Sequence, residues 1–186
     1  TDTIAIVQDG SIGTADAQFR IDLTGEQALT ARAGQDVYIT EVQGDLHLDT
    51  LYAVQHAQLI ADQSLVDAND SAATTYVNIV SQTLDLVAGG TIGGADNLLE
   101  IRLPSDGLLT ASAHAGIFVS ESDAMRVGDL SSEVGDIRLA VPDTSVTGDD
   151  LVVVSGYTVS APNGSVRLEA GDDLTIETGA NVNAGG

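Results

Sequence analysis

Residues 3–41 and 83–121 are two copies of one segment, and this internal repeat constrains the fold more than any other feature of the chain. The copies read TIAIVQDGSIGTADAQFRIDLTGEQALTARAGQDVYITE and TLDLVAGGTIGGADNLLEIRLPSDGLLTASAHAGIFVSE. Weaker matches extend the repeat, so that the sequence divides into units 3–82 and 83–163 and the start of a further unit at 164–186. Such repetition indicates that similar structural units pack against one another. We therefore expect residues 1–186 to form a single continuous segment, excerpted from a longer polypeptide.

A shorter motif recurs within each unit, in which a turn residue is followed by alternating apolar and polar residues. This alternation predicts short strands with one buried face, and the Gly, Asp, Asn and Ser residues between them predict turns. We expect loops over 67–75 and 92–98. The predicted strands are QDVYI (35–39), GDLHL (44–48), HAQLI (56–60), QTLDL (82–86), GDIRL (135–139), GSVRL (164–168) and DDLTI (172–176).

Two all-β architectures fit short strands in a unit of this length. The first is a right-handed parallel β-helix of about nine coils, with roughly 20 residues in each coil. The second is a pair of tandem β-sandwich domains, each about 80–100 residues long. The chain has no Trp and only 3% aromatic residues, whereas sandwich cores normally contain a large aromatic side chain. The β-helix is therefore the preferred prediction.

The charge of the chain excludes several classes of partner. Only 6 basic residues, all Arg, oppose 28 acidic ones, which gives a formal net charge of −22. This charge repels nucleic acids and anionic lipid headgroups, so we expect no nucleic-acid partner. No apolar run reaches the roughly 18 residues needed to span a bilayer, so we expect no membrane insertion. The absence of Cys means that no disulfide contributes to stability.

Parts of the repeat resemble a known family of proteins. The elements GSIGTADAQFRI (10–21) and GTIGGADNLLEI (90–101), each followed by LTARAGQDVYITE (29–41) or LTASAHAGIFVSE (109–121), resemble the repeats of filamentous-haemagglutinin-like adhesins and related giant bacterial exoproteins. The resemblance implies a β-helical shaft that is secreted and held at or beyond the bacterial cell surface.

Four residues are predicted to shape turns. Gly13 and Asp16 in the first copy correspond to Gly93 and Asp96 in the second. We expect both carboxylates to accept backbone N–H groups in the turn that closes a coil, since Asp commonly has this role in turns.

No cofactor is expected, and acidic loops provide the only weak metal candidates. Calcium is bound by six to eight oxygen ligands. Neither an EF-hand register nor a calcium β-roll nonapeptide is present. The three histidines, His47, His56 and His114, share no motif and are expected to face solvent. The acidic residues that could contribute to a calcium site are Asp67, Asp70, Asp149, Asp150, Asp172 and Asp173.

The sequence favours a mechanical function. We expect a shaft or filament segment that serves adhesion or attachment, and we do not expect an enzyme, because no Lys is present and the Arg residues are dispersed. The expected partners are neighbouring repeats of the same long chain, end-to-end copies, and a cell-surface or glycan receptor. A calcium-dependent adhesive domain and a polysaccharide-active β-helix are the alternatives.

Stacked coils place like charges close together, and this repulsion generates a prediction. The melting temperature should rise as NaCl is increased from about 0.01 to 0.5 M, because the Debye length shrinks severalfold over that range. Thermal unfolding followed by circular dichroism measures this effect. A melting temperature that stays flat would contradict it.

Overall fold

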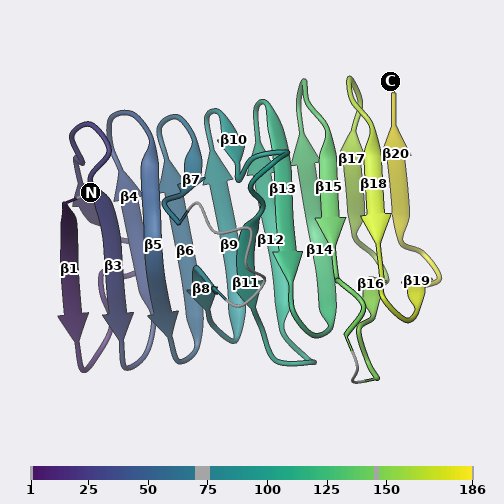
Figure 1. Cartoon of the computed structure of the whole chain (residues 1–186), viewed down its shortest axis with the longest axis horizontal. Helices are drawn as coiled ribbons and strands as arrows, with labels where there is room; N and C mark the ends of the chain where they lie inside the picture. The colour runs from purple at the N-terminus through teal and green to yellow at the C-terminus, as the bar shows by residue number, and fades with distance from the viewer. Residues whose placement is uncertain (1, 70–75, 145–146, 186) are drawn as a thin grey trace.

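The computed structural model describes residues 2–69, 76–144 and 147–185, and within these ranges every regular element is a β-strand. Twenty strands form two sheets of ten strands each (Figure 1). No helix in the described ranges is long and apolar enough to cross a membrane. The chain is therefore all-β, as its alternating pattern predicts.

The chain passes back and forth between two sheets, A and B, and some passes contribute two short strands, such as β7 and β8 in sheet A. Sheet A contains β1 (Thr3–Gln8), β3 (Ala28–Ala33), β5 (Leu46–Ala53), β7 (Leu65–Asp67), β8 (Ile79–Val80), β10 (Thr91–Ile92), β11 (Leu99–Arg102), β13 (Gly116–Glu121), β15 (Ile137–Ala140) and β18 (Val166–Glu169). Sheet B contains β2 (Phe19–Ile21), β4 (Val37–Glu41), β6 (His56–Ala61), β9 (Thr83–Ala88), β12 (Leu108–Ala113), β14 (Met125–Ser132), β16 (Leu151–Val153), β17 (Thr158–Ala161), β19 (Leu174–Ile176) and β20 (Asn181–Ala184).

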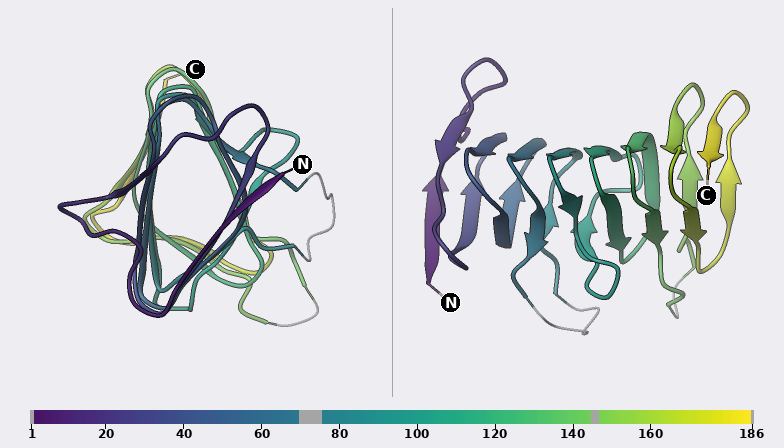
Figure 2. Two further views of the ribbon diagram at one scale, coloured as in Figure 1. Left: turned by 90° about the vertical axis from the view of Figure 1, so that its left-hand side faces the viewer. Right: turned by 90° about the horizontal axis from the view of Figure 1, so that it is seen from above.

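Strands from successive turns of the chain stack in parallel. Among the described residues, every pairing between these strands is parallel, for example β4 with β6 and β13 with β15. Seen along the stack, the turns superpose on one closed outline from which loops project (Figure 2). The fold is a β-solenoid of about eight turns, consistent with a right-handed parallel β-helix. The predicted β-helix is thus confirmed, and antiparallel sandwiches are excluded.

The number of turns differs slightly from the expected nine because several turns are longer than 20 residues. Thr30 and Thr50 lie side by side on neighbouring turns and are 20 residues apart. Elsewhere the step increases to 27 residues between His56 and Thr83, and to 29 residues between Asp129 and Thr158. Inserted loops account for the longer turns and leave the stack continuous.

Small aliphatic side chains fill the interior in columns. In sheet B, Ile39 lies above Leu59, which lies above Leu86, and the column continues through Ala111 and Leu130. All five side chains are buried. No aromatic side chain belongs to the described core. Stacked aliphatic groups therefore fill the described core without aromatic rings, in keeping with the low aromatic content of the chain.

The two copies of the repeat occupy opposite sheets. Strand β3 of the first copy lies in sheet A, whereas its counterpart β12 lies in sheet B, and β4 and β13 are exchanged in the same way. One repeat unit therefore spans an odd number of half-turns, about three and a half turns in all. Equivalent residues of the two copies consequently lie on different faces of the rod.

The Asp of the recurrent motif joins successive turns. Asp36, Asp45, Asp136 and Asp150 each immediately precede a strand. Each carboxylate accepts the backbone N–H of the equivalent residue in the next turn, at 2.8–3.1 Å. A carboxylate is an effective acceptor for backbone N–H groups, so the motif extends the hydrogen-bonded ladder by one rung beyond the strand.

This arrangement predicts the effect of removing one such carboxylate. Asp45 Oδ1 accepts the Ser64 N–H at 2.8 Å. Asp45→Ala should lower the free energy of unfolding by about 1 kcal/mol, while Asp45→Asn, which keeps an acceptor oxygen, should lose much less. Urea unfolding measures the difference.

The matched control for this prediction is Asp96→Ala, since Asp96 is exposed and its carboxylate accepts no hydrogen bond among the described residues. Equal losses for Asp45→Ala and Asp45→Asn would show that charge, not the acceptor, matters at this position.

Candidate functional site

The predicted turn residues lie in two equivalent tight turns that project from the stack. Gly13 and Gly93 have φ values of 70° and 66°, which favour glycine, and an added Cβ would collide with the carbonyl oxygens of Tyr38 and Phe118. Asp16 lies at the exposed tip of the first turn, and Asp96 lies in the exposed part of the second.

Backbone groups, and not the two carboxylates, close these turns. Thr14 and Ala17 exchange two backbone hydrogen bonds of 3.0 and 3.1 Å, and Gly94 and Asn97 do the same at 2.8 and 3.2 Å. Thr14 Oγ1 also accepts the Ala17 N–H at 3.0 Å. Neither Asp16 nor Asp96 accepts a hydrogen bond among the described residues, so the expected acceptor role was wrong.

The calcium candidates act mainly as backbone acceptors. Asp149 Oδ2 accepts the Thr144 N–H at 2.6 Å, and Asp172 Oδ2 accepts the Gly148 N–H at 2.7 Å. Asp150 accepts the N–H of Asp173. Asp70 lies outside the described residues, and Asp67 is buried. Across the described part of the chain, no three His, Asp or Glu side chains converge as a metal site would require.

The three histidines are dispersed. His56 Nδ1 lies 2.9 Å from Thr83 Oγ1 and its ring contacts Tyr38. His114 Nδ1 pairs with Glu133 Oε2 at 2.9 Å on an exposed surface. His47 is half-buried on β5.

Two equivalent glutamates point into the interior. Glu41 and Glu121 end strands β4 and β13 at inward positions, and they are 0% and 1% exposed. Glu41 accepts the N–H of Leu23 at 3.0 Å, and Glu121 accepts that of Leu103 at 2.9 Å, in each case from the preceding turn. Each glutamate therefore accepts a backbone N–H at a corner of the solenoid, where strand pairing provides no acceptor. The signal in the sequence was an acid, identical in both copies, at a position where the alternation demands an apolar residue.

Sheet A is interrupted in its middle. Strand β5 pairs with β7 through one half and with β8 through the other, so two short strands take the place of one continuous strand. In the next turn, β10 and β11 are likewise separated by the Gly93–Asn97 turn, before β13 restores a continuous strand.

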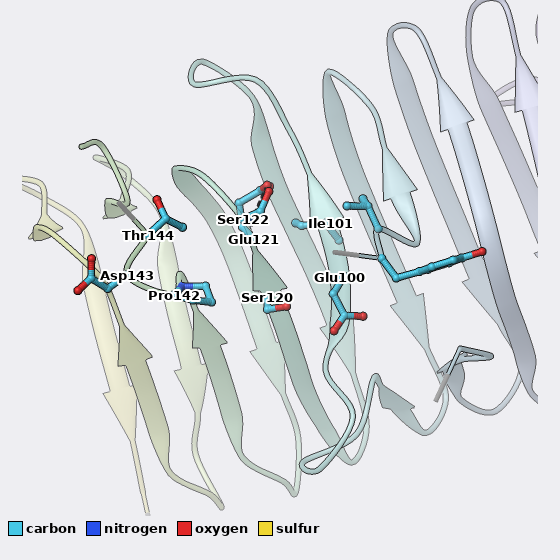
Figure 3. Close-up of a pocket in the computed structure, with 10 residues that line it drawn as sticks. Glu100, Ile101, Ser120, Glu121, Ser122, Pro142, Asp143 and Thr144 are labelled. Atoms are coloured by element: carbon cyan, nitrogen blue, oxygen red, sulfur yellow. Dashed lines mark hydrogen bonds between the residues drawn. The ribbon is translucent and has the colours of Figure 1, made fainter. Parts of the chain in front are cut away.

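A pocket of about 210 Å³ lies beside this interruption. Its labelled lining comes from β11, from β13 and the residue after it, and from the segment after β15 (Figure 3). Val77, Ile101 and Pro142 supply apolar walls, and Ser120 and Ser122 supply hydroxyl groups. The pocket therefore combines apolar and polar surface, as small-molecule sites do.

Next to this pocket, Asn78 links the Asp67 carboxylate to the backbone of Glu100. Asn78 Nδ2 donates to Asp67 Oδ1 at 2.6 Å, and Asn78 Oδ1 accepts the backbone N–H of Glu100 at 2.9 Å. Burial, followed by the negative charge of Asp67, raises the pKa of Glu100 to about 7. Burial also raises the pKa of Glu121, another lining residue, to about 8.

The sequence did not indicate that Asp67, Asn78 and Glu100 lie together. Asp67 was identified only as a calcium candidate, and Glu100 and Asn78 were not singled out. Asp67 and Glu100 come from neighbouring turns. The lengths of inserted loops determine which residues of the two turns lie side by side, and the spacing of residues within one motif does not show this.

Comparison with known proteins gives no relative: no family model, curated protein or solved structure matches this chain. Its function must therefore be inferred from its own geometry.

Glu121 predicts a specific pH dependence. Its pKa in the folded protein is about 8, above the ordinary 4.5, so its contribution to stability is full below about pH 4.5 and is lost as pH rises toward 8. Glu121→Gln should therefore gain stability relative to the unmodified protein between pH 5 and pH 8.5, by roughly a few kcal/mol. Urea unfolding at constant ionic strength measures the gain.

Exposed Glu26 provides the control, because Glu26→Gln removes one charge without a buried contact. Its stability difference should not change with pH. If the Glu121→Gln difference is equally flat, Glu121 is ionised throughout and the prediction is wrong.

Proposed function

We propose that this chain is a rigid shaft segment of a long, secreted bacterial surface protein that serves adhesion or attachment between cells. The observation that carries the proposal is the uniform parallel stack. Each turn satisfies the backbone of its neighbours, so that length can be extended by adding turns. The repeats that this chain resembles belong to proteins of that kind, which supports a location at the cell surface or outside the cell.

The end turns support the proposal further. Strand β1 begins sheet A with one edge unpaired, and it exposes Ile4, which is 38% accessible and lies in register with buried Leu29. At the other end, Leu174 and Ile176 of β19 are 48% and 50% accessible. Unpaired edges with apolar side chains are templates for further pairing. Another turn, from the same polypeptide or from a second copy, would cover them.

The high charge is compatible with this role. A rod with a net charge of −22 resists lateral aggregation, because its sides repel one another. Stacking at the ends then remains the favoured mode of association, especially when salt screens the charge.

End-to-end assembly tests the proposal. At about 0.5 M NaCl, where screening is strong, the purified chain should form thin fibres of one diameter, visible by electron microscopy. Ile4→Lys and Ile176→Lys should each block elongation, since lysine on an edge strand disfavours further pairing.

Val134→Lys is the matched control, because Val134 is 51% exposed and lies between β14 and β15, away from both ends. It should leave fibre formation intact. Monomers that never associate, or fibres equally sensitive to Val134→Lys, would contradict stacking through the end turns.

A further inference from the structure

The two ends of the solenoid present different faces. The first face is formed by β1 and β2, and the last face by β18, β19 and β20, and each of these strands pairs along one edge only. The buried column of sheet B begins at Phe19 on the first face and ends at Val182 on the last. Phe19 is 44% exposed and Val182 is half-buried. Each end of the column therefore lacks the apolar neighbour that every interior member has.

Loops divide some passes of the chain through a sheet into two short segments, and divided passes lie beside one another inside the stack. In sheet A, β7 and β8 lie beside β10 and β11. In sheet B, β16 and β17 lie beside β19 and β20. The pass formed by Ile12 and β2, which the turn at 13–17 divides, has the continuous strand β4 on one side. Among the described residues it is the divided pass without a divided neighbour.

The loops of the first and last divided passes project from the same side of the rod. Seen from above, the purple loop near the N-terminus and the green and yellow loops near the C-terminus all extend beyond sheet B (Figure 2). A second copy placed in line, with each sheet continuing the same sheet, brings the turn at 13–17 beside the turn at 177–180. The divided pass of the first face then gains a divided neighbour, formed by β19 and β20.

The residues that precede the strands give the stack a direction. Ser11 Oγ accepts the N–H of Asp36, and the Asp36 carboxylate accepts the N–H of His56 in the following turn. Asp150 accepts the N–H of Asp173 in the same way. The carboxylate of Asp173 and the hydroxyl of Ser165, which precede β19 and β18, make no hydrogen bond among the described residues. The acceptors that remain free in these positions therefore lie on the last face.

We propose that the last face of one copy binds the first face of a second copy, so that Val182 of one lies above Phe19 of the next. This inference rests on the proposed shaft function, and it names the partner and the contact. Head-to-tail stacking leaves the same two faces free after each addition, so the fibre is polar and can extend indefinitely.

The two other end contacts lack this continuity. Contact between two first faces would reverse the winding across the junction and pair the strands antiparallel, although the described strands pair only in parallel. Contact between two last faces would bring together two Asp173 carboxylates, neither of which can donate a hydrogen bond.

A mixture of two blocked variants tests the direction of stacking. Ile4→Lys blocks the first face and Ile176→Lys blocks the last, since lysine on an edge strand disfavours pairing. At about 0.5 M NaCl, where screening is strong, each variant alone should remain monomeric. An equimolar mixture should form a dimer of one copy of each, because one intact first face then meets one intact last face. Sedimentation velocity measures the mass. Val134→Lys is the control and should form fibres by itself.

A disulfide tests the register with both faces unblocked. Arg20 and Asn183 begin and end the outward row next to the buried column. The chain contains no Cys, so Arg20→Cys and Asn183→Cys each introduce a single thiol. In the proposed contact their Cα atoms lie about 4.8 Å apart, which permits a disulfide. With oxidised glutathione, a mixture of the two variants should form a linked dimer, and neither alone should.

Asn181→Cys replaces Asn183→Cys in the control mixture. Position 181 is equally exposed and lies on the same strand, two residues out of register. Its Cα would lie about 8 Å from that of position 20, which is too far for a disulfide. This mixture should therefore give no linked dimer. Because the cysteine variants keep both faces intact, they decide the matter even if a lysine variant does not fold.

Each result has a defined meaning. If the unmodified chain forms fibres but either lysine variant dimerises by itself, like faces associate, and head-to-tail stacking is wrong while end stacking stands. If fibres form but neither mixture gives its dimer, the contact lies elsewhere and the proposal is overturned. If the unmodified chain never associates, both this inference and the assembly on which it rests fail, and another segment of the polypeptide covers the end turns.

Discussion

The structure depends on one requirement: each turn must find hydrogen-bond partners for its backbone in the turns above and below it. Parallel pairing meets this requirement along the strands. The corners need other acceptors, and acidic side chains provide several of them. Asp45 and Asp136 extend the ladder beyond strand ends, while Glu41 and Glu121 satisfy corner N–H groups from inside. The acidity of the chain is therefore partly structural, because carboxylates accept hydrogen bonds without needing to donate any.

The inward acids show how this requirement competes with the hydrophobic core. A buried glutamate costs free energy when ionised, and burial raises the pKa of both Glu41 and Glu121. The backbone N–H groups that they accept act in the opposite direction and lower the pKa. An apolar residue would avoid the desolvation but would leave the N–H of Leu23 or Leu103 buried without a partner. Each glutamate thus incurs the desolvation cost of a buried carboxylate, but it removes the cost of a buried backbone N–H without a partner.

The sequence predicted the strands and their stacking well, because alternation of apolar and polar residues is a local signal. All seven predicted segments form or overlap strands, from β4 at QDVYI to β19 at DDLTI. The exchange of sheets between the copies was not predictable, since a period near 80 residues does not say whether it holds a whole or a half number of turns. The pairing of Asp67 with Glu100 was hidden for a related reason. Their meeting depends on inserted loops, whose lengths change the register between turns.

The position of the pocket follows from the same architecture. Continuous strands β5 and β13 flank the two interrupted turns, so the stack remains intact on either side of the break. The alternating pattern lapses at the break, where Asn78 just before β8 and Ile79 within it are both buried, so that a polar side chain takes an interior position. A solenoid can therefore present a polar site on its side without losing the pairing that makes it a rod. Asp67 ends β7 at an inward position, as Glu41 and Glu121 end β4 and β13, but at the interruption its Oδ1 accepts the Asn78 side chain and the Asn69 N–H.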